Sequence, residues 1–138
     1  MRITSSSGYK EIDHIADVAL QVWAPNLPEL FIQAAKGLFV LMRCDSVPEK
    51  LPIREFSLRE NGLENLLVRF LNELLHFAED KRVAYHPIEM RLNKSSLYSR
   101  LEGRKILNVR REIKATTYHQ LKIEHSRLGY QVVITFDV

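Results

Sequence analysis

The chain has 138 residues, of which 46% are hydrophobic and 27% charged, and its 20 Lys and Arg residues outnumber its 17 Asp and Glu residues. This length and balance are typical of one globular domain and exclude a low-complexity or disordered chain. The start lacks the apolar run of a signal peptide, and no stretch approaches the roughly 20 apolar residues of a membrane span. We therefore expect a single cytoplasmic domain over residues 1–138, with residues 1–7 flexible.

Two short strands and a helix are predicted first. The two strands span residues 10–14 and 16–23, and in the second Val18, Leu20 and Val22 share one face, as in a half-buried strand. Asn26, followed by Glu29 three residues later, is typical of a helix start, and apolar residues then recur at helical spacing up to Leu41.

A second helix is predicted in the middle of the chain. Residues 44–52 contain two prolines and are expected to be a connection, and residues 53–60 alternate as a strand. Asn61, with Glu64 three residues on, is predicted to cap a helix whose apolar stripe runs from Leu63 to Phe77. The single cysteine, Cys44, has no His or Cys at metal or redox spacing, so we expect a reduced, packed thiol.

The second half of the chain predicts successive antiparallel strands, because alternating runs are separated by the turn sequences NKSS, EGRK and SRLGY. The predicted fold class is α+β. Two amphipathic helices would pack on one face of a mainly antiparallel β-sheet and leave its other face or its ends free for function.

Positive charge is concentrated between Arg91 and Lys114, where eight basic residues are opposed only by Glu102 and Glu112. Such a segment would steer toward an acidic partner. It would equally serve as a solvated strand edge that Lys and Arg protect against aggregation. The sequence leaves both interpretations open.

The last nine residues, YQVVITFDV, alternate as a strand that runs to the final residue. An ordered end would hold the Asp137 carboxylate beside the terminal carboxylate of Val138, and two adjacent anions destabilise each other unless a cation neutralises them. A lysine could supply the positive charge, and so could a hard metal ion such as Ca²⁺ or Mg²⁺, which prefers oxygen ligands.

Two further segments combine residues that could carry chemistry. Residues 11–17, EIDHIAD, place His14 and Asp17 at a bend between the first two strands, and residues 111–119, REIKATTYH, carry Lys114. Taken alone, His14 could be a loop histidine, Asp17 a turn acceptor and Lys114 a solvated edge charge.

Together these segments resemble the archease family. The resemblance runs in order over nearly the whole chain, through IDHIADVALQVW, the helix LPELFIQAAKGLF, LLVRFLNELL, EIKATTYHQLKIE and a terminal DV. It implies an accessory protein, without catalytic activity of its own, for the GTP-dependent tRNA-splicing RNA ligase. That ligase joins RNA ends bearing 2′,3′-cyclic or 3′-phosphates to 5′-hydroxyl ends. The resemblance implies that this protein promotes guanylylation and multiple turnover of the ligase and broadens its nucleotide use.

The resemblance also implies the site. A divalent metal ion, Ca²⁺ or Mg²⁺/Mn²⁺, would be bound by Asp17, Asp137 and Val138, and Lys114 would act with them in activating the ligase. Two features depart from the family pattern, namely Ile15 where Thr or Pro is usual, and residues 24–26 where a glycine is common. Tyr118 and His119 match the family pattern and are expected to have structural or rim roles.

Two other functions remain open. A stand-alone metal-dependent phosphoesterase would use Asp13, His14, Asp17 and Asp137 and would turn over without a partner. An RNA-binding module would use the basic segment between Arg91 and Lys114 and would show strongly salt-dependent affinity. The sequence contains no phosphate-binding glycine loop, which favours a helper protein over an enzyme.

Overall fold

The computed structural model describes residues 6–13 and 17–138. Residues 1–5 of the segment predicted to be flexible lie outside the described residues. In chain order the elements are β1 (Gly8–Asp13), β2 (Val18–Ala24), α1 (Leu27–Met42), β3 (Cys44–Ser46), β4 (Arg54–Arg59), α2 (Leu63–Asp80), β5 (Val83–Leu92), β6 (Ser96–Val109), β7 (Ala115–Thr117), β8 (Glu124–Ser126) and β9 (Gly129–Asp137).

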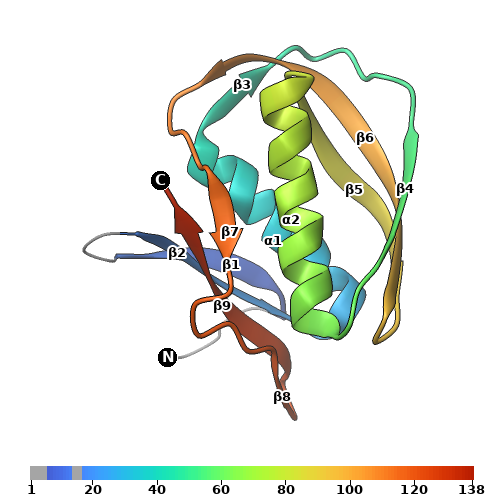
Figure 1. Ribbon diagram of the computed structural model, residues 1–138, viewed down its shortest axis with the longest axis vertical. Helices are drawn as coiled ribbons and strands as arrows, with labels where there is room; N and C mark the ends of the chain where they lie inside the picture. Colours follow the sequence, from blue (N-terminus) through green and yellow to red (C-terminus); the bar gives the residue numbers. More distant parts are fainter. Residues whose placement is uncertain (1–5, 14–16) are drawn as a thin grey trace.

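The strands form two antiparallel sheets. In the first sheet the order is β1-β2-β9-β7, and β8 pairs with another part of β9. In the second sheet the long strand β6 is central, with β5 on one edge and β3 and β4 on different parts of the other. Both helices contact strands of both sheets, so they lie between them (Figure 1).

The predicted α+β class is confirmed, with two helices packed against antiparallel strands. The strands divide between two sheets instead of forming one. Alternation along the sequence identifies strands but does not specify which strands pair, because that depends on long-range packing.

The apolar stripes of both helices supply much of the core. Phe31 of α1 and Phe70 of α2 are fully buried, with ring centroids 6.4 Å apart. Burying a side chain of this size stabilises the fold by about 1.5–3 kcal/mol. Among the described residues, no helix is both long enough and apolar enough to cross a membrane.

The two helices begin differently. At α1 the Asn26 side chain accepts a hydrogen bond from the backbone N–H of Glu29, as predicted. The prediction that Asn61 caps α2 is wrong, because Gly62 is the N-cap residue with φ of 101° and no side chain caps the helix there. The Glu64 carboxylate instead accepts a hydrogen bond from the backbone of Ile123, 59 residues further along the chain.

The segment around Cys44 is also more ordered than the sequence suggested. Residues 44–46, predicted to lie in a connection, form β3 and pair with the C-terminal part of β6. The Cys44 side chain packs against the core, and burial raises the pKa of its thiol. The structure therefore agrees with the prediction of a packed thiol.

Candidate functional site

The first sheet brings Asp17 and Asp137 to the same end of two neighbouring strands. β2 and β9 are antiparallel, and their pairing ends with Val18 opposite Phe136. Asp17 immediately precedes Val18, and Asp137 immediately follows Phe136. Two residues 120 positions apart in the sequence therefore lie at the same end of the β2–β9 pair. Figure 1 shows that the C-terminus is at this end of β9.

The segment that carries Lys114 lies on the other side of β9. Ala115 pairs with Asp137, and the backbone N–H of Lys114 donates a 2.8 Å hydrogen bond to the Asp137 carbonyl oxygen. β9 thus lies between β2 and β7. The three segments predicted to hold the site meet at one sheet end, and we call Asp17, Lys114, Asp137 and Val138 the terminal cluster.

Alternation along β9 directs Asp137 away from the core. Phe136 is fully buried, whereas Asp137 is exposed and Val138 is 48% exposed. Asp17 is half-buried and Lys114 is exposed. In the described part of the chain, the side chains of the two aspartates and of Lys114 make no hydrogen bond or ion pair, so the two carboxylates have no counterion there.

Helix α2 fixes the position of β7. The Asn72 side chain accepts a 2.7 Å hydrogen bond from the backbone N–H of Thr116 and donates a 3.4 Å hydrogen bond to its carbonyl oxygen. The Glu64 carboxylate accepts a 3.0 Å hydrogen bond from the Ile123 N–H and so holds the loop that follows β7. Two polar side chains of α2 thereby hold β7, which directly follows Lys114, and the loop after it.

A hollow of about 330 Å³ lies on the first sheet, and the four residues of the terminal cluster are not among those that line it. Thr135, which shares a face of β9 with Asp137, is one of its lining residues, and His119 and Lys122 line it from the loop after β7. Residues two apart on a strand are separated by about 7 Å. The remaining lining residues are Gln21, Gln120, Glu124, Gln131, Val132 and Val133.

Sequence reasoning missed Lys122 and Gln131 as residues that line this hollow. The signal available for Gln131 was its position in the alternating run at the chain end, since it shares a strand face with Asp137. Lys122 had no signal, because its place depends on the loop that Glu64 holds.

The remaining predicted residues follow β7 or lie in the sequence at or next to the end of β1. Tyr118 is 57% exposed and directly precedes His119. Both residues follow β7, which ends at Thr117. The Asp13 side chain, His14 and Ile15 lie outside the described residues.

The atoms that Asp17, Asp137 and the terminal carboxylate of Val138 would offer to a metal ion are all oxygen atoms. Among the described residues, no group of three or more His, Cys, Asp and Glu side chains could hold a metal ion. A metal site here would therefore depend on two aspartate side chains together with the main-chain carboxylate of Val138. Carboxylate oxygens suit hard divalent ions such as Ca²⁺ and Mg²⁺.

Comparison with known proteins gives one consistent family. Residues 9–138 match the model of the archease protein family. The chain is 30% identical to a protein named archease from Saccharolobus islandicus, over 94% of this chain and 98% of the relative. It is 31% identical to an archease from Thermococcus kodakarensis, over 84% of this chain and 87% of the relative.

Solved structures agree with the sequence matches. A crystal structure from Thermotoga maritima, described as an archease and possible chaperone, superposes with a TM-score of 0.69 at 25% identity, over 94% of this chain and 96% of that one. A solution structure of a Methanobacterium thermoautotrophicum protein has a TM-score of 0.72 at 21% identity, over 95% and 99% of the two chains, and supports the fold.

Proposed function

Because the chain belongs to the archease family, we propose that it is an accessory activator of the GTP-dependent tRNA-splicing RNA ligase. In this proposal it promotes guanylylation and multiple turnover of the ligase in tRNA splicing or RNA repair, broadens its nucleotide use and acts in the cytoplasm. The observation that carries the proposal is the register of β2, β9 and β7, which places Asp17, Asp137, Val138 and Lys114 at one sheet end.

The terminal cluster fits a divalent metal ion. Its carboxylates are hard oxygen donors, and those of Asp17 and Asp137 have no counterion among the described residues. Asp17, Asp137 and the terminal carboxylate of Val138 would hold Ca²⁺ or Mg²⁺/Mn²⁺. When bound, such an ion supplies positive charge that attracts phosphate or carboxylate oxygens.

Lys114 would contact the ligase or its nucleotide directly. Its side chain is exposed, its backbone is fixed to Asp137, and an ammonium group is a strong donor to triphosphate or carboxylate oxygens. Val138, which follows the pairing partner of Ala115, is a partly exposed apolar residue that offers surface for docking. The chain's own contribution is to present these groups on a rigid sheet end.

A ligation assay tests the proposal. The ligase is supplied at substoichiometric concentration with GTP, manganese and RNA ends of the required chemistry, with and without this protein. We expect the protein to raise the number of turnovers per ligase, and Asp17→Ala, Asp137→Ala or Lys114→Ala to reduce this stimulation at least tenfold without changing the melting temperature. Asp80→Ala, which removes an exposed carboxylate paired with Lys81 at the end of α2, is the matched control and should stimulate fully.

The same assay separates the proposal from a phosphoesterase. Phosphate release by the purified protein with a divalent ion and no ligase would contradict the activator role. Absence of stimulation, with the ligase competent for a single turnover, would contradict it as well.

A further inference from the structure

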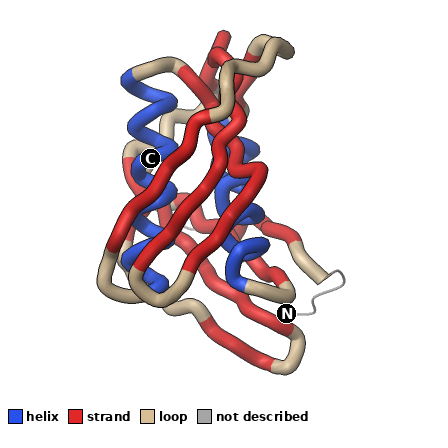
Figure 2. The backbone as a smooth tube through the Cα atoms, turned by 90° about the vertical axis from the view of Figure 1, so that its right-hand side faces the viewer, coloured by secondary structure: helices blue, strands red, loops and turns tan. Residues whose placement is uncertain are grey.

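The outer face of the second sheet lies on the far side of the helices from the first sheet. Figure 2 views the strands β4, β6 and β5 with the helices behind them. The inward side chains of these strands, such as Leu58 and Leu97, are buried in the core. Their alternating neighbours, including Arg59 and Tyr98, point outward.

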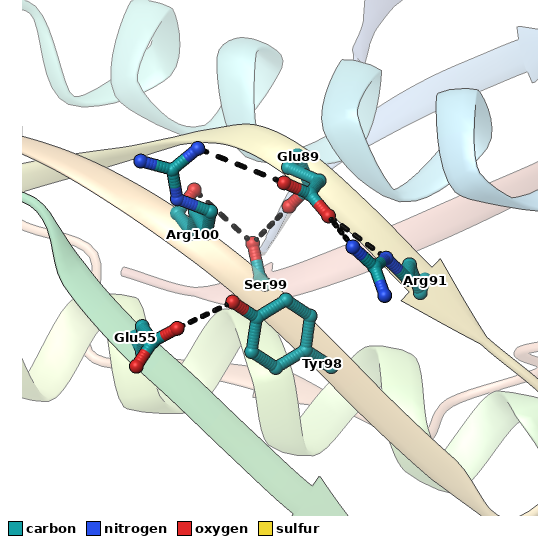
Figure 3. A network of polar contacts seen from close by, with 6 residues as sticks. All are labelled: Glu55, Glu89, Arg91, Tyr98, Ser99 and Arg100. Atoms are coloured by element: carbon teal, nitrogen blue, oxygen red, sulfur yellow. Dashed lines mark hydrogen bonds and ion pairs between the residues drawn. The ribbon is translucent and has the colours of Figure 1, made fainter.

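Arginine predominates on this face around one tyrosine. We define the arginine face as Arg59, Arg91, Lys94, Tyr98 and Arg100, with Tyr98 directly opposite Arg91 on β5. The Arg91 guanidinium lies 5.4 Å from the centre of the Tyr98 ring. The Tyr98 hydroxyl donates a 2.7 Å hydrogen bond to Glu55 (Figure 3).

Two carboxylates on this face, Glu55 and Glu89, do not balance the four cations of the arginine face. Glu89 is shared by two arginines, since it accepts a 2.8 Å hydrogen bond from Arg91 and lies 3.8 Å from Arg100 (Figure 3). Among the described residues, Arg59 and Lys94 make no side-chain ion pair. The arginine face therefore carries excess positive charge that is available to an anionic partner.

The same face contains a hollow of about 560 Å³. Arg59, Arg91 and Tyr98 line it together with the polar residues Ser57, Asn93 and Ser96. Its volume lies within the range of ligand sites. Cations, amide and hydroxyl groups, and an aromatic ring thus converge on one concave surface of a sheet.

We propose that the arginine face binds single-stranded nucleic acid, with phosphates contacting Arg59, Lys94, Arg91 and Arg100 and one base stacking on Tyr98 or on the Arg91 guanidinium. Open sheet faces with aromatic and arginine side chains bind splayed-out bases in this way, and the cations follow the backbone. An acidic protein segment would use the cations but would leave the stacking surface unused. The inference is independent of the terminal cluster, which is on the other sheet.

Fluorescence anisotropy with labelled 12-nucleotide oligo-U and oligo-dT tests the inference, using the full chain without ligase at 50 and 200 mM salt. We expect Arg59→Ala with Arg91→Ala to weaken binding at least tenfold and to flatten the dependence on salt. Tyr98→Leu should weaken binding about fivefold or more at unchanged salt dependence, because stacking is lost while the charges remain.

A charge-matched variant is the control. Lys10→Ala with Arg127→Ala also removes two exposed positive charges, but from β1 and from the turn between β8 and β9, and it should bind within twofold of the unmodified chain. If the first double variant loses stability, Arg59→Glu replaces it, since Arg59 makes no ion pair with the described residues. Equal affinity for the RNA and the DNA oligonucleotide would support recognition through phosphates and stacking. Tighter binding of the RNA would add a role for the 2′-hydroxyl.

Three results would overturn the inference. The first is no anisotropy change at 0.1 mM protein in 50 mM salt. The second is equal weakening by the two double variants, which would indicate unspecific attraction. The third is that Tyr98→Leu binds the oligonucleotides as tightly as the unmodified chain and that a poly-glutamate peptide competes as well as an unlabelled oligonucleotide. That result would assign the face to an acidic protein.

Discussion

Two residues that are adjacent in the sequence can have opposite environments in this molecule. Phe136 is fully buried and Asp137 is exposed, because successive side chains of a strand point to opposite faces. This alternation was readable from the sequence, so the direction of Asp137 was predictable. That Asp137 lies beside Asp17 was suggested only by the family resemblance, since the sequence does not specify the pairing of β2 with β9.

His86 makes folding stability depend on pH. The ring is partly buried, with its centroid 4.9 Å from that of Phe39. Burial lowers the pKa of His86, Arg104 and Lys36 lower it further, and Glu102 acts in the opposite direction. The folded pKa therefore lies below the unfolded value of about 6.5. Between these two values the unfolded chain binds more protons, so stability falls as the pH drops through this window.

Urea unfolding between pH 7.5 and pH 5 measures this effect. We expect His86→Gln to lose less free energy of unfolding over that range than the unmodified chain. His76→Gln removes an exposed histidine of α2 and should leave the slope unchanged. A slope unaffected by His86→Gln would refute this account.

Gly129 and Gly62 form a matched pair for backbone strain. Both have positive φ, 117° and 101° respectively, which an L side chain tolerates poorly. A Cβ at Gly129 would also overlap the carbonyl oxygen of Ala24 and the backbone of Pro25, whereas a Cβ at Gly62 would meet nothing within 4 Å. We expect Gly62→Ala to cost about 1–2 kcal/mol and Gly129→Ala more than about 3 kcal/mol. Equal losses in chemical denaturation would show that the overlap is relieved.

Helix α2 both fills the core and holds β7 and the loop that follows it. Its apolar stripe was evident from helical spacing, and the helix forms as predicted. Its polar contacts were not predictable, because Asn72 and Glu64 bind backbone groups that lie 44 and 59 residues away. For the same reason the sequence suggested Asn61 and Glu64 as a local cap, while tertiary contacts assign Glu64 a different role. β3 was missed because a three-residue strand leaves too short a pattern.

Removal of Asn72 tests how firmly α2 holds β7. Asn72→Ala leaves the part-buried N–H of Thr116 without its partner, which should destabilise the fold by about 1–3 kcal/mol. Amide hydrogen exchange at residues 115–117 should accelerate. Asn65→Ala is the control, since the Asn65 side chain makes only a solvent-exposed hydrogen bond to the Asn61 carbonyl oxygen, and it should cost less than about 0.5 kcal/mol. Equal effects of the two variants would mean that α2 does not anchor β7.

For the whole molecule, two sheets enclose two helices and present two different surfaces. The first sheet carries the terminal cluster, and the outer face of the second carries excess arginine. The class and the two helices were predictable from the sequence because each has a local pattern, whereas the grouping of the cluster residues came from the family resemblance. The arginine face was visible only as a basic segment, since Arg59 on β4 joins it through strand pairing. In our two proposals, the first surface contacts the ligase and the second binds single-stranded nucleic acid.

In the proposed function, the terminal carboxylate of Val138 is part of the site that activates the ligase. The direct measurement is multiple-turnover ligation with two extended forms of the protein, one with four Gly-Ser residues after Val138 and one with the same residues before Met1. We predict that the first form loses stimulation of the ligase while the second stimulates fully, because only the first replaces the terminal carboxylate by an amide. Equal stimulation by both forms, at equal melting temperature, would contradict the account.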